Sequence, residues 1–223
     1  MSNALVSHHK PDGAFHHGIR GRFNAWFFST VDRYANHIAR AHKGTAFAGL
    51  ASRKVLEIGA GVGANLAYLA PGSKLVALEP NLAMHDRLRA RCARYGIPLT
   101  VIAGVAERIP LPDSSVDDVI CSLVLCTVAD PEQVLAEVRR VLRSGGRFRF
   151  VEHVAARRGG PRRLVQRLLR RPWAWLFEGC QLDRDTAHVI GQAGFSDVRI
   201  VDQRFRRSVF YPVNSAVWGV ARV

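Results

Sequence analysis

The sequence of 223 residues lacks a long apolar run. Its longest uncharged apolar run, residues 119–129, has eleven residues, whereas a helix needs about 20 to span a bilayer. The first ten residues contain two histidines and no apolar segment of the kind that a secretory signal requires. These absences predict a chain without membrane-spanning segments that works in the cytoplasm.

Cysteine is also scarce, with four residues, and no two of them form a CxxC pair. Cys121 and Cys126 fall inside the apolar run, where cysteine behaves as a small hydrophobic side chain. Cys92 and Cys180 are isolated in the sequence. The spacing therefore predicts neither a disulfide framework nor a metal site.

Acidic residues are outnumbered, with 18 Asp and Glu against 32 Lys and Arg and a formal net charge of +14. Such an excess raises nucleic acid or an anionic membrane as a partner, because bound cations release counterions. Only four of the basic residues are lysine, however, and genome composition alone produces an arginine bias of this kind. A nucleic-acid partner is not favoured, and an RNA-binding protein or RNA methyltransferase is the less favoured alternative, because no aromatic-basic surface motif is recognised beyond the arginine-rich residues 157–176.

Predicted strands and helices alternate along the middle of the chain. Short apolar strands are expected at residues 54–58, 74–78, 99–102, 118–124 and 147–152, and helices at 64–69, 82–95 and 131–142. The nearly continuous apolar character of residues 118–124 is typical of a parallel strand that is covered on both faces. This alternation predicts an α/β fold with a mostly parallel, Rossmann-like sheet.

Both ends of the chain depart from this alternation. Aromatic and apolar residues recur at helical spacing near the N-terminus, and seven arginines among residues 157–171 mark an inserted helix. After a helix at residues 183–193, residues 198–201 and 210–220 are expected to add an antiparallel pair at one edge of the sheet. The chain is thus predicted to be one domain, residues 1–223, made of an N-terminal helical cap (13–50), a core (51–155), an inserted lid (156–180) and a C-terminal part (181–223).

Glycines follow the first predicted strand directly, in the run Glu57-Ile58-Gly59-Ala60-Gly61-Val62-Gly63. Glycine allows a sharp turn from strand to helix and lets a ligand approach the backbone. Glu79 ends the next strand, where an acid can bind a ribose diol. Glu57 would repel the pyrophosphate of a dinucleotide, whereas the ammonium and sulfonium charges of S-adenosylmethionine are compatible with it. The two acids therefore favour S-adenosylmethionine as the ligand.

The glycine run, residues 75–80, residues 106–107 with 111–117, and the run through Gly146 together resemble class I methyltransferases over about residues 50–155. The resemblance implies S-adenosylmethionine as cofactor and S-adenosylhomocysteine as product. It implies cofactor contacts at Glu57, Gly59, Ala60, Gly61, Gly63, Asn65, Glu79, Pro80, Asn81, Val105, Ala106, Glu107, Cys121 and Leu123. One departure is that many relatives carry, where Val105 stands, an aspartate that binds the adenine amino group. Glu107 or the backbone would have to replace it here.

Residues 121–128, 150–156 and 172–180 resemble a narrower group, the alkyl-thiol methyltransferases. This resemblance implies S-methylation of a small, largely apolar thiol. Those relatives usually carry an N-terminal membrane anchor, for which this sequence has no comparable segment. C-methyltransferases of quinones and phospholipid N-methyltransferases share the first set of motifs, so O-, N- or C-methylation of a phenol, quinone or phospholipid head group is the alternative.

Methyl transfer from a sulfonium mainly requires alignment of donor and nucleophile and the exclusion of water. His153 follows the fifth predicted strand, where ligands bind in open α/β sheets, and is the candidate base, with Glu152 orienting it. A histidine that caps the strand end and a glutamate paired with arginine are the alternative interpretations. A nucleophilic role for Cys121 or Cys126 is disfavoured, because direct transfer needs no covalent enzyme intermediate.

Four aromatic residues, Phe23, Phe27, Trp175 and Phe177, are candidates for the wall of an acceptor pocket, although core packing explains aromatic residues at helical spacing equally well. The arginine-rich insert is interpreted first as a lid. A basic amphipathic helix flanked by tryptophan also suits weak contact with an anionic membrane surface, and RNA contact is the third interpretation. The expected partner is a small-molecule acceptor, and the sequence does not indicate an oligomeric state.

Overall fold

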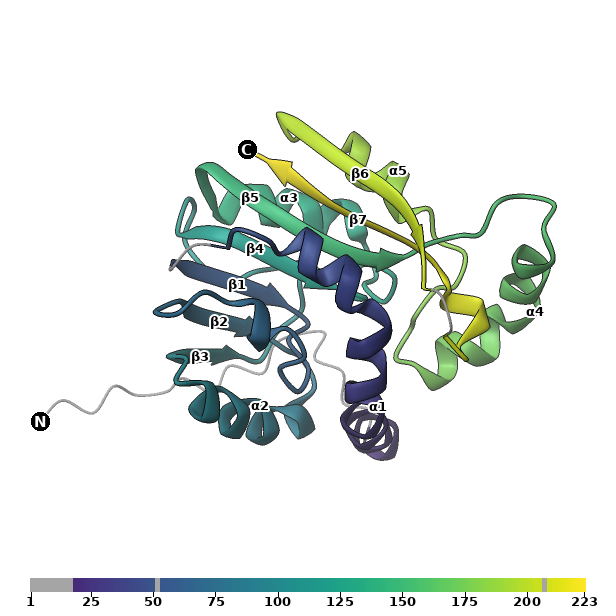
Figure 1. Cartoon of the computed structure of the whole chain (residues 1–223), viewed down its shortest axis with the longest axis horizontal. Coiled ribbons are helices and arrows are strands. Elements are labelled where there is room, and N and C mark those ends of the chain that lie inside the picture. The colour runs from purple at the N-terminus through teal and green to yellow at the C-terminus, as the bar shows by residue number, and fades with distance from the viewer. Residues whose placement is uncertain (1–17, 51–52, 206–207) are drawn as a thin grey trace, which may run out of the picture.

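The computed structural model describes residues 18–50, 53–205 and 208–223. Within them, one sheet contains the strands β1 (Lys54–Ile58), β2 (Lys74–Leu78), β3 (Leu99–Ile102), β4 (Val116–Ser122), β5 (Leu142–His153), β6 (Asp197–Arg204) and β7 (Ser215–Arg222). The longer helices are α1 (Gly18–Ala46), α2 (Leu82–Tyr95), α3 (Pro131–Val141), α4 (Pro161–Leu176) and α5 (Thr186–Gln192), and the short 3-10 helices are Leu66–Tyr68 and Tyr211–Val213 (Figure 1).

The sheet has the strand order β3-β2-β1-β4-β5-β7-β6. The first five strands in the chain pair in parallel, whereas β7 is antiparallel to both β5 and β6. The antiparallel strand β7 is the second strand from the edge of the sheet, and β6, which pairs with it, forms the edge itself. The predicted mostly parallel, Rossmann-like α/β fold is confirmed.

Helices cover both faces of the sheet. In Figure 1, α1 passes in front of the strands and α3 and α5 lie behind them. Val134, Leu135 and Val138 of α3 pack with Ile190 of α5 in the core on the rear face. The apolar spacing on α3 explains this packing, and the Asp130 side chain caps the helix by accepting a hydrogen bond from Gln133 N.

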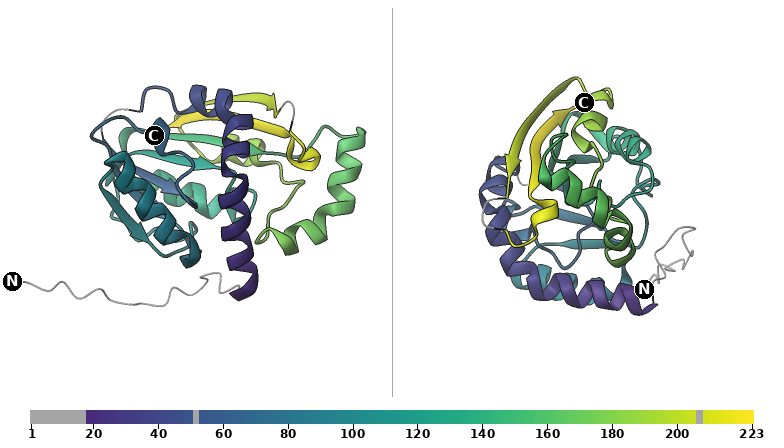
Figure 2. Two further views of the ribbon diagram at one scale, coloured as in Figure 1. Left: turned by 60° about the horizontal axis from the view of Figure 1, so that its bottom comes forward. Right: turned by 90° about the vertical axis from the view of Figure 1, so that its right-hand side faces the viewer.

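The carboxyl ends of β1–β5 point toward α4 and the N-terminal half of α1, which both stand outside the sheet (Figures 1 and 2). The Asn24 side chain of α1 donates to the Leu176 carbonyl of α4 at 3.0 Å. The Arg20 guanidinium lies 5.6 Å from the Trp175 ring centroid. These contacts join the N-terminal helix and the inserted helix over one end of the sheet. No helix in the described ranges is both long and apolar enough to cross a membrane.

Several predicted boundaries were wrong. The last strand, expected at residues 210–220, is Ser215–Arg222 and follows the 3-10 turn Tyr211–Val213. Three further differences lie within residues 51–155. The helix expected at residues 64–69 is only the 3-10 turn Leu66–Tyr68, because the turn that follows β1 continues through residue 65. The fourth strand begins and ends two residues earlier than expected, since Leu123 adopts a positive φ of 61°. The fifth strand starts at Leu142 instead of residue 147. Gly145 and Gly146 lie within it, where its register with β4 shifts between the pairs Val116↔Leu142 and Asp118↔Arg147.

A buried arginine connects the sheet to the end of α1. The Arg149 guanidinium donates to the Asp118 carboxylate at 3.0 Å and to the carbonyls of Ala46, Ala48 and Gly49 at 2.8 to 3.3 Å. Only 3% of the Arg149 side chain is exposed. These hydrogen bonds satisfy the carbonyl of the last residue of α1, which the helix leaves unpaired, and two carbonyls of the turn that follows it.

We expect Arg149→Leu to lower the free energy of unfolding by about 3–5 kcal/mol, because it leaves a buried carboxylate and buried carbonyls without partners. Arg143→Leu is the matched control, since Arg143 pairs with the neighbouring Asp117 at 2.7 Å but is half exposed, and we expect a change below about 1 kcal/mol. Urea unfolding of the two variants measures both values. Equal losses would show that the buried network contributes no more than a surface pair.

Candidate active site

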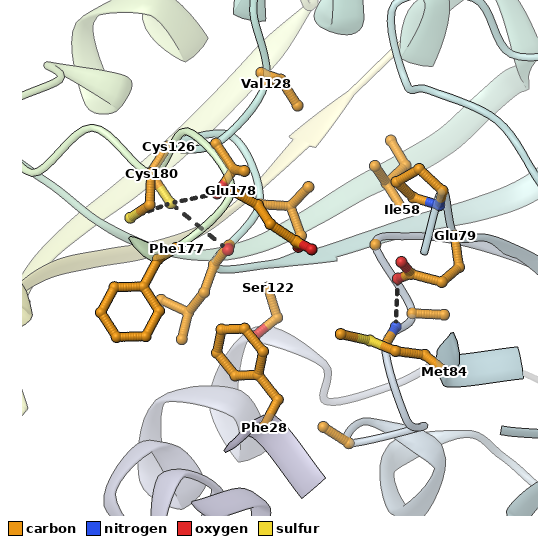
Figure 3. Close-up of a pocket in the computed structure, with 18 of the residues that line it drawn as sticks. Phe28, Ile58, Glu79, Met84, Ser122, Cys126, Val128, Phe177, Glu178 and Cys180 are labelled. Carbon is orange, nitrogen blue, oxygen red and sulfur yellow. Dashed lines mark hydrogen bonds between the residues drawn. The ribbon is translucent and has the colours of Figure 1, made fainter. Parts of the chain in front are cut away.

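A cavity of about 480 Å³ lies at the carboxyl ends of β1, β2, β4 and β5. The glycine turn after β1 and the end of β2 form one part of its wall, and side chains of α1, of α4 and of the segment after α4 form another. In Figure 3, Glu79 and Met84 occupy the side of the cavity opposite Cys126, Cys180 and Phe177. The cavity therefore has two chemically different ends.

Glu79 organises the first end. Its Oε2 accepts from Gly61 N and its Oε1 from Asn81 N, both at 2.8 Å (the Gly61 bond is drawn in Figure 3). Burial raises the pKa of Glu79, and these two backbone hydrogen bonds counteract the rise. Each carboxylate oxygen can accept a further hydrogen bond, so this residue, which lines the cavity, can still bind a diol.

The glycine turn requires the residues that the sequence supplies. Gly59 and Gly61 have φ values of 63° and 54°, which favour glycine. A Cβ on Gly59 would lie 2.4 Å from Cγ2 of Val124, so the backbone packs directly against the segment after β4. Ala60 lines the cavity beside them, whereas Gly63 is absent from the lining and packs on Leu66.

Glu57 lies behind the glycine turn and does not line the cavity. Its Oε1 accepts from Asn65 Nδ2 at 2.7 Å, and Asn65 does line the cavity. Burial raises the pKa of Glu57 from 4.5 to about 7, against the opposing effects of Asn65 and Lys43. Glu57 therefore affects the cavity only indirectly, by holding the side chain of Asn65. Asn81 is likewise outside the lining, where it caps α2 by accepting from Ala83 N.

Four of the predicted cofactor contacts, Pro80, Val105, Ala106 and Glu107, lie together in the cavity lining. One carboxylate oxygen of Glu107, Oε1, accepts from Ala129 N at 2.8 Å. It ties the turn after β3 to the segment before α3. These residues supply a mainly apolar surface and backbone groups for a flat ring.

Leu123 also lines the cavity, whereas Cys121 is fully buried below it. The Cys121 thiol donates to Glu152 Oε1 at 3.3 Å, and the same oxygen accepts from Val124 N at 3.0 Å. Glu152 thus fixes the segment after β4. Among the residues that the structure describes, Glu152 Oε2 has no hydrogen-bond partner, so the carboxylate bonds neither His153 nor an arginine.

His153 lines the cavity at the end of β5. Its Nε2 lies 3.1 Å from Cys180 Sγ, which is 3.7 Å from Cys126 Sγ and accepts from Trp173 Nε1 at 3.3 Å. Burial lowers the pKa of His153, but Cys180 and Glu152 raise it overall. The hydrogen bond with Cys126 and the nearby His153 hold the pKa of the Cys180 thiol well below its ordinary range.

The aromatic candidates divide between the cavity and the surface. Phe27 and Phe177 line the cavity with ring centroids 5.3 Å apart, and Phe23 stacks on Phe27 from outside the lining. Trp175 is 65% exposed and does not reach the cavity, because helical geometry turns it away from the lining residue Trp173.

The sequence-based prediction missed several residues of the lining. They are Phe28, Cys126, Trp173, Glu178, Cys180 and Phe210. Glu178 bonds to Asn81 Nδ2 at 3.2 Å, and burial raises its pKa to about 7, with the neighbouring Glu79 adding to the rise. Its positive φ of 49° is a local feature that no sequence pattern indicated.

The raised pKa of Glu57 predicts a change of stability with pH. Because the folded carboxyl holds its proton up to about pH 7 and the unfolded one loses it near 4.5, its contribution to stability falls as pH rises between these values. We expect the unfolding free energy of wild type minus that of Glu57→Gln to fall across this window, by at most about 1.4 kcal/mol per pH unit. Urea unfolding at several pH values, with Glu132→Gln as the control for loss of an exposed carboxyl, measures it. A difference that is flat with pH would contradict the prediction.

Known proteins resemble this chain in sequence. Residues 56–150 match a family model described as a methyltransferase domain. The chain is 40% identical over 149 residues to thiol S-methyltransferase TMT1B of Rattus norvegicus and 37% identical over 158 residues to thiol S-methyltransferase TMT1A of Homo sapiens. These alignments cover 66% and 69% of this chain but only 61% and 65% of the relatives, so the chain spans less than two thirds of their length.

Solved structures share the fold at low sequence identity. A SAM-dependent methyltransferase of Thermotoga maritima has a TM-score of 0.64 at 19% identity, covering 91% of this chain and 99% of its own. Another, from Aquifex aeolicus, has a TM-score of 0.61 at 17% identity, covering 88% and 97%. The family and the fold imply S-adenosylmethionine as methyl donor, and the cavity carries the glycine turn and the buried acid that suit it. Residues 56–150 are therefore a methyltransferase domain, in a chain that has the fold of the S-adenosylmethionine-dependent methyltransferases.

Proposed function

We propose that the protein transfers a methyl group from S-adenosylmethionine to the sulfur of a small, largely apolar thiol. One observation carries the proposal: a single cavity joins the glycine turn and Glu79 to an end lined by aromatic rings and by His153. The similarity to proteins named thiol S-methyltransferases supports sulfur as the acceptor atom. When bound, S-adenosylmethionine supplies a methyl group on a sulfonium that a nucleophile can displace.

In this proposal the two ends of the cavity have separate tasks. Glu79 accepts hydrogen bonds from the ribose hydroxyls, the Gly59–Gly61 backbone borders the methionine part, and residues 105–107 flank the adenine. Asn65, held by Glu57, lies next to the methionine part as a polar partner. These tasks need positioned groups rather than mobile ones, because displacement requires the donor and the acceptor in line at near-attack distance.

The aromatic end binds the acceptor and excludes water. Phe27, Phe28 and Phe177 are in mutual contact there, with ring centroids 5.3 to 6.3 Å apart. Such a wall suits an apolar acceptor and removes the bulk water that would solvate its sulfur. His153, the imidazole in the lining, assists removal of the thiol proton, and Glu152 positions the adjoining segment.

A product-mass screen with labelled S-adenosylmethionine and a panel of alkyl thiols, phenols, amines and quinones tests the acceptor. We expect methylated alkyl thiols, and a rate at least roughly tenfold lower for His153→Ala. His188→Ala, which removes an exposed histidine on α5, is the control. Methylation of phenols, amines or quinones with no thiol product would replace the proposed acceptor class.

We propose, second, that the exposed face of α4 makes weak contact with an anionic membrane surface. Leu164, Leu168 and Trp175 lie on one face of the helix and are 52%, 70% and 65% exposed. Arg167 and Arg171 are exposed beside them. Apolar side chains flanked by arginine and tryptophan suit the boundary between head groups and acyl chains.

Sedimentation with vesicles tests this contact. We expect the protein to bind vesicles that contain phosphatidylserine more than pure phosphatidylcholine vesicles, and the binding to weaken as salt rises. The Leu168→Ser/Trp175→Ser variant should lose most of it, while Leu82→Ser, which removes an exposed leucine on α2, should not. Equal binding by all three proteins would refute the proposal.

We propose further that the chain acts as one domain in the cytoplasm. A single sheet includes strands from residue 54 to residue 222. The sequence also has few cysteines and no CxxC pair, which suits a reducing compartment, where disulfides are rare.

A further inference from the structure

Three soft donor atoms meet at the aromatic end of the cavity. Cys126 Sγ, Cys180 Sγ and a ring nitrogen of His153 all lie within 4.8 Å of one another. The three residues come from different segments: the loop after β4, the end of β5 and the loop after α4. All three are buried, and all three belong to the cavity lining.

The spacing of these atoms matches a tetrahedral metal site. An ion at about 2.3 Å from each sulfur and about 2.0 Å from an imidazole nitrogen sets two sulfurs about 3.8 Å apart and each sulfur about 3.5 Å from the nitrogen. The observed separations are 3.7 Å for Cys126 to Cys180 and 3.1 Å for Cys180 to His153. Two of the three separations thus lie within about 0.4 Å of the tetrahedral values, and the third, from Cys126 Sγ to the His153 ring, is below 4.8 Å.

Backbone hydrogen bonds hold the three segments together. Gln181 N donates to the Cys126 carbonyl at 2.8 Å, so the residue that follows Cys180 is bonded directly to Cys126. Ala155 N donates to the Arg184 carbonyl at 3.0 Å, which joins the end of β5 to the segment after α4. The donors are therefore positioned before any ion binds.

The surroundings also suit two thiolates. The Trp173 indole N–H donates to Cys180 Sγ at 3.3 Å, and such outer hydrogen bonds orient and tune metal ligands. Arg184 donates to the carbonyls of Leu125 and Val128, on either side of Cys126, and places a positive charge near both sulfurs. A divalent ion, two thiolates and a neutral imidazole sum to zero charge, which limits the cost of burial.

We propose that Cys126, His153 and Cys180 bind a thiophilic divalent ion, zinc, with its fourth position open to the cavity. Two sulfur ligands and one nitrogen ligand favour zinc over magnesium or calcium, and three protein ligands with one open position are the pattern of catalytic zinc sites. The fourth ligand would be the acceptor thiol, which binds as the thiolate and releases its proton to water. His153 would then assist removal of the thiol proton through the bound ion, as one of its ligands, rather than as a free imidazole base.

Only this fourth ligand rests on the proposed function, because binding of the ion by the three side chains does not depend on methyl transfer. In the transfer itself, the acceptor sulfur would form a bond to the methyl carbon. The bond from that carbon to the sulfonium breaks, and its electron pair stays on the sulfur of S-adenosylhomocysteine. Electrons therefore balance without an oxidant or a reductant.

Cobalt(II) absorption of the full-length protein tests the site. The protein is stripped with a chelator, kept reduced with a phosphine and titrated with Co²⁺ and then with Zn²⁺. We expect one Co²⁺ per chain, a sulfur-to-cobalt charge-transfer band with the visible bands of tetrahedral cobalt, and loss of both when Zn²⁺ displaces Co²⁺. Absence of the charge-transfer band from the wild-type protein would overturn the proposal, whatever the variants do.

Matched variants locate the ligands. Cys126→Ser, Cys180→Ser and His153→Ala should each lose or shift the cobalt spectrum, whereas Cys92→Ala, in the separate apolar cluster under α2, should leave it unchanged. An unchanged spectrum in the first three variants would place the cobalt elsewhere. Circular dichroism of each variant reports whether it folds.

Addition of a small alkyl thiol tests the fourth position. We expect the visible cobalt bands to shift with the thiol and not with its S-methyl product. Visible cobalt bands that do not change when the thiol is added would overturn the proposed open fourth position. Failure of the proposed function appears differently, as a normal cobalt site in a protein that methylates no thiol. Full thiol methylation by a protein that binds no cobalt would overturn the metal site alone.

Discussion

The cavity depends on a buried carboxylate held between two backbone N–H groups. Glu79 is 5% exposed, and an isolated buried carboxylate is strongly unfavourable without hydrogen-bond donors. Gly61 N and Asn81 N supply them from opposite sides, so the glycine turn after β1 and the start of α2 are fixed relative to the end of β2. Gly59 then brings this turn against Val124, which fixes the segment after β4 as well.

A second buried carboxylate does the same at the other end. Glu152 accepts from Val124 N and from the Cys121 thiol, and it holds the loop that carries Cys126. The next residue in β5, His153, faces the cavity beside Cys180. Two acids at the ends of strands therefore place the two halves of the site, and neither needs to take part in the chemistry. This arrangement suits a reaction whose main requirement is alignment.

The helices outside the sheet decide what the cavity can admit. The N-terminal half of α1 and the end of α4 meet through Asn24 and Leu176 and supply Phe27, Phe28 and Trp173 to the aromatic end. The opposite face of α4 presents leucine and tryptophan to solvent. One inserted helix thus contributes to the aromatic end with one face and leaves an apolar and basic face exposed, the face for which membrane contact is proposed.

The sequence by itself determined the α/β alternation, the glycine turn and the acid at Glu79, because strand period, glycine conformation and the position of an acid after a strand are local properties. It also indicated His153, which follows a strand whose carboxyl end faces the site. Only the tertiary structure decided that Glu57 acts through Asn65, that Trp173 rather than Trp175 lines the cavity, and that Cys126 and Cys180 meet His153. Residues 126, 153 and 180 are far apart along the chain, so no spacing could reveal a cluster that forms when three segments converge at one end of the sheet.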